Sequence, residues 1–213
     1  MATHIGARLR GARLEQGLSL RGVAEAVGVS ASLVSQVETG KTQPSVSTLY
    51  AMVSHLGISM DDLLEEGDPP AGRRSSRAAP RPLPLEPTDP HFGHGGQNPV
   101  LEMENGVRWE RLASGEDGPA DALLVTYEPG ASSSIEGRLM RHSGIEYAYL
   151  LEGELELQLE FDTFVLRAGD SLQFDSVRPH LYANRGSVPA RGVWFVVGRR
   201  RPGDAPVSRA SGP

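Results

Sequence analysis

The sequence predicts two domains, a small all-α bundle over residues 1–66 and an all-β sandwich or barrel over residues 85–198. Apolar residues recur with helical spacing in the first segment and with two-residue spacing from Val100 onward. Residues 67–84 are rich in Pro, Ala, Ser and Arg and have almost nothing to bury, which indicates a flexible linker. Residues 199–213 are expected to form a disordered tail.

Length and composition narrow the protein class. The 213 residues suffice for two modest domains, each with its own core. Without cysteine, neither disulfides nor thiolate zinc sites are available, which suits a reducing cytoplasm. No stretch approaches the roughly 20 apolar residues of a membrane span, and no signal segment begins the chain. We therefore expect a soluble cytoplasmic protein with no membrane partner.

Charge is distributed unevenly between the two predicted domains. The net charge is −6, to which residues 1–57 contribute +2, residues 71–84 contribute +4 and residues 85–198 contribute −10. The acidic charge therefore lies on the second domain, where it need not face a polyanion. Repulsion from that domain could orient docking on a nucleic acid and suppress non-specific binding.

Five helices are expected in the first domain. The first is marked by apolar residues around Leu9, the fourth runs from Val46 to Leu56, and a short fifth surrounds Leu63. The second follows Ser19, a good N-cap because its hydroxyl accepts an orphaned backbone N–H. Its apolar residues stand at positions i, i+3, i+4 and i+7, so one face is expected to be buried.

The third predicted helix carries the strongest functional signal. It follows the N-cap Ser30 and ends before Gly40, which readily adopts the left-handed conformation that terminates helices. One stripe is apolar, whereas the opposite side is small or amide-bearing and uncharged. Only Gly28 and Val29 separate this helix from the second. This is the helix-turn-helix arrangement, whose second helix enters the DNA major groove.

Several motifs in this region fall in register with a known family. Arg8-Leu-Arg-Gly-Ala-Arg, Ala24-Glu-Ala-Val-Gly-Val-Ser and Ser35-Gln-Val-Glu-Thr-Gly-Lys resemble the phage-repressor-like (XRE) DNA-binding family. The resemblance covers residues 4 to about 65 and implies a lambda-repressor-like five-helix bundle. It also implies that Arg13 and Glu38 tie the first helix to the third.

The same resemblance implies which residues meet DNA. Ala31, Ser32 and Gln36 are expected to face base edges, whereas Ser19, Thr39 and Lys41 are expected to contact phosphates. The alternative for each residue is an ordinary solvated helix face. The expected DNA-binding residues are Ser19, Ser30, Ala31, Ser32, Ser35, Gln36, Thr39 and Lys41.

The second domain is predicted to contain many short strands, which are separated by residues typical of turns. Glu154 to Phe161 alternates throughout, which predicts one strand with one buried face. Tyr147 to Leu151 is apolar on both faces, which suggests a strand covered twice, as at a dimer contact. The remaining strand candidates are residues 101–111, 122–128, 146–151, 163–166, 171–174, 180–184 and 191–197. Such regular spacing favours a sandwich or barrel.

Two segments of this domain carry candidate ligands. His142 and Glu146 share parity, and so do His180 and Asn184, so each pair can point to one face. The surrounding segments, His142 to Gly153 and Gly169 to Asn184, are similar to the two motifs of the cupin family, a jelly-roll barrel around a ligand pocket.

The cupin resemblance implies that His142, Glu146 and His180 ligate a divalent metal. Met140 stands where the family usually has a further histidine, and a thioether is a poor ligand for such ions. Two imidazoles and one carboxylate still form a sufficient facial triad for iron(II), and nickel, zinc or manganese are further candidates. In the alternative, the pocket holds no metal and both histidines hydrogen-bond to Glu146. The expected ligand pocket is lined by Met140, Tyr182 and Trp194.

Three functions follow from these expectations. The first is a transcription regulator that reads an inverted-repeat operator as a homodimer while its cupin domain senses a small molecule, a divalent metal or both. The second is an enzyme, because the domain order and ligand set also resemble the iron-dependent hydroxypropylphosphonate epoxidase. The third is a scaffold that binds DNA constitutively and uses its barrel to dimerise. The uncharged face of the third helix favours the regulator over the enzyme.

Overall fold

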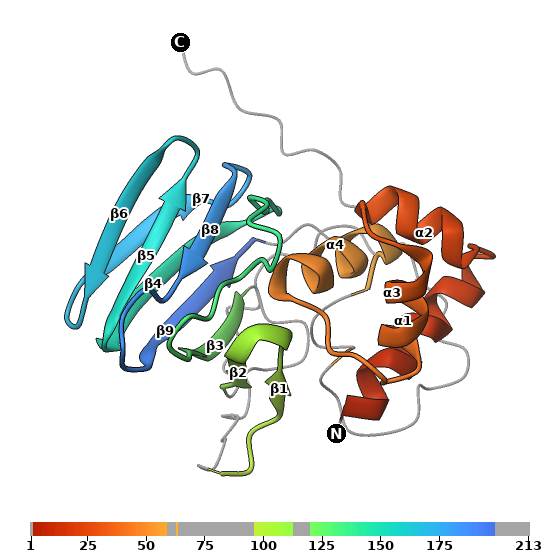
Figure 1. The fold of residues 1–213 in the computed structure, drawn as a ribbon, viewed down its shortest axis with the longest axis horizontal. Coiled ribbons are helices and arrows are strands. Elements are labelled where there is room, and N and C mark those ends of the chain that lie inside the picture. Colours follow the sequence, from red (N-terminus) through yellow and green to blue (C-terminus); the bar gives the residue numbers. More distant parts are fainter. Residues whose placement is uncertain (1, 59–62, 64–95, 113–119, 199–213) are drawn as a thin grey trace, which may run out of the picture.

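A computed structural model describes residues 2–58, 63, 96–112 and 120–198, and it contains a helical domain beside a β-barrel (Figure 1). The predicted linker at 67–84 and the predicted tail at 199–213 lie outside the described residues. None of the described helices has the length and apolar character that a membrane crossing requires.

The described helical domain has four helices, one fewer than predicted. They are α1 Ala2–Glu15, α2 Leu20–Val27, α3 Ala31–Glu38 and α4 Val46–Leu56. Of the expected fifth helix only Leu63 is described. It is in helical conformation and buried.

Local chemistry sets the limits of the helix-turn-helix. Ser19 Oγ accepts a hydrogen bond from Gly22 N at 3.0 Å, and Ser30 Oγ accepts one from Leu33 N at 3.1 Å, so both predicted N-caps are formed. Gly28 ends α2 with φ of 72°, a conformation that costs glycine no steric penalty. The predicted tight turn between α2 and α3 is therefore confirmed.

A buried ion pair holds α1 against α3. Arg13 Nε lies 2.6 Å from Glu38 Oε1, and Arg13 Nη2 donates to Glu38 Oε2 at 2.8 Å. The two side chains are 9% and 3% exposed. The tie between the first and third helices that the family resemblance implies is therefore present.

The barrel is built from two antiparallel sheets that enclose a core (Figure 1). One sheet has six strands in the order β1-β2-β3-β9-β4-β7, and the other has three in the order β6-β5-β8. The strands are β1 Val100–Glu102, β2 Val107–Arg111, β3 Ala120–Tyr127, β4 Ile145–Glu152, β5 Glu154–Leu159, β6 Asp162–Arg167, β7 Ser171–Asp175, β8 His180–Ala183 and β9 Ala190–Val197.

The structure corrects the predicted strand at residues 101–111. This segment forms two strands, β1 and β2, which pair antiparallel around the turn η1 Glu104–Gly106. Asn105 and Gly106 both have positive φ, 72° and 74°. Asn-Gly favours this reversal because both residues tolerate the left-handed region, so the chain folds back where the apolar pattern alone suggested continuity.

The structure also corrects the end of the strand predicted to reach Phe161. Strand β5 stops at Leu159, which pairs with Asp162 of β6, and Glu160 takes a positive φ of 57°. Phe161 therefore sits at the tip of a tight hairpin and is 102% exposed instead of buried. The alternation of apolar and polar residues therefore extends beyond the end of the strand into the turn.

Helix α4 faces the barrel and joins the two domains. Ser47 N, in the first turn of α4, donates to Ser133 O of the barrel at 2.9 Å. Arg138 Nη1 of the barrel donates to Gly28 O, in the turn before α3, at 2.9 Å. Seven of the eleven residues of α4 are buried, because one side packs in the bundle and the other meets the barrel.

Candidate functional site

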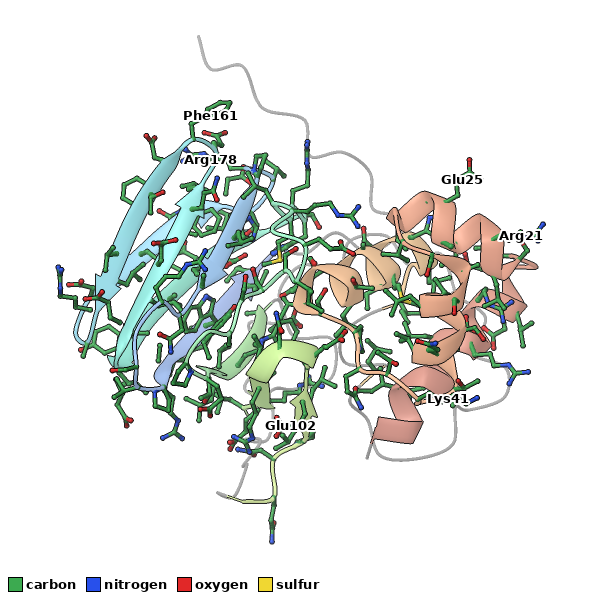
Figure 2. The ribbon with its side chains drawn as sticks, in the orientation of Figure 1. Arg21, Glu25, Lys41, Glu102, Phe161 and Arg178 are labelled. Carbon is green, nitrogen blue, oxygen red and sulfur yellow. The ribbon has the colours of Figure 1, made fainter. Side chains whose placement is uncertain are left out.

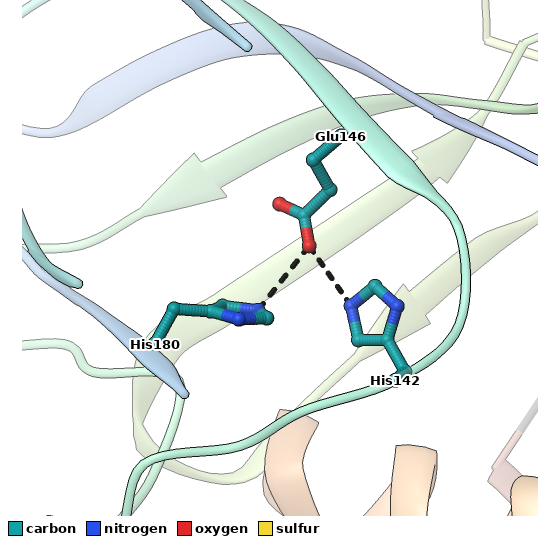
Figure 3. Close-up of side chains that lie close together, drawn as sticks. All are labelled: His142, Glu146 and His180. Atoms are coloured by element: carbon teal, nitrogen blue, oxygen red, sulfur yellow. Dashed lines mark ion pairs between the residues drawn. The ribbon is translucent and has the colours of Figure 1, made fainter. Parts of the chain in front are cut away.

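Three ligand-type side chains converge inside the barrel, as Figure 3 shows. Glu146 Oε1 lies 2.8 Å from His142 Nε2 and 3.2 Å from His180 Nε2. The side chains of His142, Glu146 and His180 are only 5%, 3% and 0% exposed. The structure therefore brings together the three residues that the sequence proposed as metal ligands.

Different strands position these side chains. Glu146 lies on β4 of the larger sheet, with His142 on the segment that enters this strand, whereas His180 opens β8 of the smaller sheet. The backbone of Met140 pairs with that of His180 through two reciprocal hydrogen bonds of 2.8 Å. This pairing ties the segment that carries His142 to the opposite sheet, so the three ligands meet where the two sheets approach.

Backbone carbonyls orient both imidazoles. His180 Nδ1 lies 2.8 Å from Arg178 O, and His142 Nδ1 lies 3.2 Å from Ser143 O. A carbonyl only accepts, so each contact places a proton on Nδ1 and turns Nε2 toward Glu146 Oε1. A cation that takes the place of the Nε2 protons would bind both Nε2 atoms, with a carbonyl fixing the orientation of each ring as in many metal sites.

Glu146 carries a negative charge in this site. Burial acts to raise its pKa, but the hydrogen-bonding and charge interactions with His142 and His180 outweigh burial and hold the pKa well below its ordinary value. Its other oxygen, Oε2, accepts a hydrogen bond from Tyr182 OH at 3.0 Å. Burial and the charge of Glu146 raise the pKa of Tyr182 well above its usual range, so Tyr182 stays a neutral donor.

The donor set fits a divalent cation. Within the described chain, Nε2 of both histidines and Oε1 of Glu146 have no hydrogen-bond partner of good geometry, although all three are buried. Buried polar atoms rarely remain unsatisfied. Ligand bonds of about 2.1 Å at right angles place neighbouring ligand atoms about 3.0 Å apart, close to the spacing between Glu146 Oε1 and each Nε2. A cation would satisfy all three atoms at once.

Next to these residues lies a cavity of about 20 Å³. The predicted pocket residues Met140, Tyr182 and Trp194 all line it, together with Glu146. Asn184, which shares parity with His180, does not take part in this site. Its amide donates to two backbone carbonyls at 2.8 and 2.9 Å and so has a structural role.

Sequence reasoning missed six residues of this cavity wall, among them two aromatic residues that come from different domains. Tyr50 comes from α4, and Trp109 comes from β2. A signal was present, because α4 is apolar on more than one face, and a helix that is apolar all round is buried on several sides. The pattern does not say what buries the second face, and the structure places the barrel there.

The second candidate site is the polar face of α3. Ser19, Ser30, Ser32, Gln36, Thr39 and Lys41 are exposed, and Ala31 and Ser35 are partly exposed. Lys41 lies on the helical domain away from the barrel (Figure 2). Thr39 Oγ1 also donates to Ser35 O at 2.8 Å. None of the eight predicted residues is packed inward, so this face is open to a partner.

Comparisons with known proteins show that two regions of the chain each match a domain family. Residues 4–67 match the model of a helix-turn-helix domain family, and residues 123–196 match that of the cupin domain family. The chain therefore contains a region similar to helix-turn-helix domains, followed by a region similar to cupin domains.

Two relatives that align with more than four-fifths of the chain are named as transcriptional regulators. The HTH-type transcriptional regulator PuuR of Escherichia coli K12 is 29% identical, over 84% of this chain and 86% of its own length. SutR of the same organism is 25% identical, over 87% and 90%. The crystal structure of an HTH_3 family regulator from Vibrio cholerae matches with a TM-score of 0.61 and 20% identity, over 93% of this chain and 97% of that one. This last match shows a shared two-domain fold.

Proposed function

We propose that this protein is a sequence-specific transcription regulator that reads an operator with α3 and senses a small molecule, a divalent metal or both in its cupin domain. The observation that carries the proposal is the exposed, uncharged polar face of α3, which follows a tight turn. Relatives across more than four-fifths of the chain are named as transcriptional regulators, which supports it. Such a protein acts in the cytoplasm, where bacterial DNA lies.

Each part of the α3 face has its own role in this proposal. Gln36 is exposed, and its amide suits bidentate recognition of adenine in the major groove. Ala31 and Ser32 are small and let the helix approach base edges closely. Thr39 and Lys41, past the end of α3, are proposed to contact the phosphate backbone. The same role is proposed for Ser19 and Ser30, the N-cap residues of α2 and α3. Ser35 lines the same face.

We propose that a second copy covers the outer face of the six-stranded sheet. On this face Tyr147, Tyr149, Leu151 and Phe195 are 42–48% exposed, and all of them except Leu151 line a groove of about 360 Å³. Contiguous apolar surface of this kind marks interaction sites. The two-fold axis of such a dimer matches an inverted-repeat operator with half-sites about 34 Å apart.

His142, Glu146 and His180 are proposed to hold the sensed metal. This facial set suits iron(II), and nickel, zinc or manganese are also compatible with it. A bound cation supplies open coordination positions to which a small chelating ligand can attach. The protein contributes the orientation of both imidazoles, the charge of Glu146 and a dry aromatic wall.

A mononuclear iron cupin enzyme is the second candidate, because the buried ligand set leaves coordination positions for a substrate. The regulator ranks first, since the relatives that span the chain are regulators. Iron-dependent oxygen consumption with small organic acids, abolished by His180→Ala, would reverse this ranking. An operator affinity that is the same with and without a cell-extract metabolite pool would favour the constitutive scaffold.

Operator selection from random double-stranded DNA, followed by affinity measurement, tests the regulator. Gln36→Ala should cost about 1–3 kcal/mol and relax the preference at one base position. Lys41→Ala should weaken binding to all sequences alike and flatten the salt dependence by about one unit of slope. Arg167→Ala, which removes an exposed charge from the barrel, is the matched control.

Selection that enriches no sequence would contradict this proposal. So would a selected site whose affinity and base preference are the same for the wild type and for Gln36→Ala.

A further inference from the structure

One wall of the barrel site comes from the helical domain. The ring of Tyr50, on α4, lies parallel to the imidazole of His142, with 4.4 Å between ring centroids and 7° between planes. Its edge meets Trp109 of the barrel at 5.4 Å and 69°. Tyr50 is only 7% exposed. The side chain that covers a metal-ligand candidate therefore belongs to the domain that carries α3.

This covering leaves very little space. The cavity of about 20 Å³ is lined by Val46 and Tyr50 of α4 and otherwise by barrel residues. A water needs about 10–15 Å³ by this kind of measure, whereas sites for organic ligands span about 300–1,000 Å³. With α4 in place, the cavity admits a water-sized ligand and no organic molecule.

We propose that α4 is the lid of the barrel site and that Tyr50 is its inner surface, so that an organic ligand in the site and docking of the helical domain exclude one another. The inference rests on the proposed function and adds the ligand class. Two neutral imidazoles, the Glu146 carboxylate and a divalent cation leave one net positive charge, and Trp109 and Trp194 supply aromatic walls. Such a site suits a small chelating anion with an apolar body.

The docked lid also fixes α3 relative to the barrel. The hydrogen bond from Ser47 N to Ser133 O anchors the start of α4. The bond from Arg138 Nη1 to Gly28 O anchors the turn that leads into α3. When a ligand displaces α4, both bonds must break. The reading helix then loses its fixed distance from the barrel and, in a dimer, from its symmetry mate.

Thermodynamic linkage provides the test. If ligand binding requires undocking, a change that weakens docking without touching the cavity must strengthen ligand binding by the corresponding factor. Arg138→Ala is such a change, because Arg138 contacts Gly28 across the domain boundary and does not line the cavity. Arg167→Ala is the matched control, because Arg167 pairs with Glu154 within the barrel.

The probes are Ni²⁺ alone and Ni²⁺ followed by acetohydroxamate, a small bidentate anion, titrated calorimetrically into the full chain. Arg138→Ala and Tyr50→Ala should each bind acetohydroxamate several-fold more tightly than the wild type. Arg167→Ala should match the wild type. The affinity for Ni²⁺ alone should change less than twofold in Arg138→Ala, because the ion fits beneath the docked lid.

The distance between the domains provides a direct readout. The chain has no cysteine, so the double variant Glu25→Cys, Phe161→Cys takes spin labels at those two sites alone. Both positions are exposed and lie on different domains (Figure 2). Double electron–electron resonance measures the distribution of distances between the two spin labels. Ni²⁺ alone should leave this distribution unchanged, and Ni²⁺ with acetohydroxamate should broaden it.

The inference is overturned if acetohydroxamate binds all variants equally, if it binds without changing the distance distribution, or if no variant takes up Ni²⁺. None of these measurements uses DNA. Failure to bind any operator would therefore remove the proposed function and leave this competition intact, and the reverse outcome is equally distinguishable.

Discussion

Replacing Glu38 by alanine should destabilise the helix-turn-helix domain severely while leaving the cupin domain folded. Glu38 is the counter-charge of Arg13, and the pair is bidentate and almost fully buried. The hydrogen bond that Arg13 donates to Glu38 raises the pKa of Arg13 above its ordinary value, so the guanidinium stays charged throughout the accessible pH range. Glu38→Ala therefore leaves a buried cation without a partner.

The expected cost is about 3–5 kcal/mol, the range for breaking a buried ion pair from one side. A domain of about 60 residues has a total stability of roughly 3–9 kcal/mol, so this loss removes most of it. The bond from Arg13 Nη1 to Leu18 O at 2.9 Å remains and offsets a small part. The double variant Arg13→Met, Glu38→Ala removes both charges and should cost far less than the sum of the single changes Arg13→Met and Glu38→Ala.

Two optical signals separate the domains in the full chain. All four described α-helices lie in the first domain, so circular dichroism at 222 nm follows its unfolding. Both tryptophans of the chain, Trp109 and Trp194, lie in the barrel, so their fluorescence follows the second domain. Denaturant titrations of the wild type, both single variants and the double variant complete a cycle, with the exposed Glu15→Ala as the control.

A loss below about 1 kcal/mol for Glu38→Ala would refute the reasoning, because an exposed pair behaves in that way. A double variant as unstable as the sum of the single variants would refute it too, since the two side chains would then act independently.

Three further predictions concern the barrel. At 100 times its dissociation constant, Ni²⁺ should stabilise the wild type by about 2.7 kcal/mol and His180→Ala hardly at all, as measured by thermal unfolding. Gly192→Ala should destabilise the barrel by about 1–3 kcal/mol, because the new Cβ would lie 2.6 Å from Tyr149 O and 2.8 Å from the Trp194 ring, and unchanged denaturant midpoints would contradict this. Because the pKa of Glu146 is lowered on folding from its ordinary 4.5, its stabilising effect is complete above pH 4.5 and declines below it. Glu146→Gln should therefore lose less stability than the wild type between pH 5 and pH 3, and parallel loss in the two proteins would count against this.

The helix-turn-helix was predictable because its signals are local. Ser19 and Ser30 cap helices by accepting hydrogen bonds from residues only three positions ahead. Gly28 ends α2 because its own backbone adopts a positive φ. Each such interaction depends on neighbours in the chain and can be read from a short window. The two missed reversals, at Asn105 and at Glu160, were local as well, but the apolar alternation around them masked the turn chemistry.

The metal-ligand candidates were predictable only in part. Parity on one strand places His142 and Glu146 on the same side, but nothing in the spacing brings His180 to them from the opposite sheet. Only the resemblance to cupins suggested that meeting, and the tertiary structure brings His180 Nε2 within 3.2 Å of Glu146 Oε1. Closure of the barrel, which joins strands distant in sequence, decides this contact.

The sequence by itself determined the helical and β-rich regions, the helix-turn-helix and the types of side chain offered to a ligand. Only the tertiary structure decided that Tyr50, from the helical domain, stacks on His142 and closes the site. The physical reason is that caps and periodicity arise among neighbouring residues, whereas the packing of α4 on the barrel depends on the fit between two surfaces that are distant in the sequence. Periodicity marks α4 as buried on two sides, and it contains no information about which surface meets the second side.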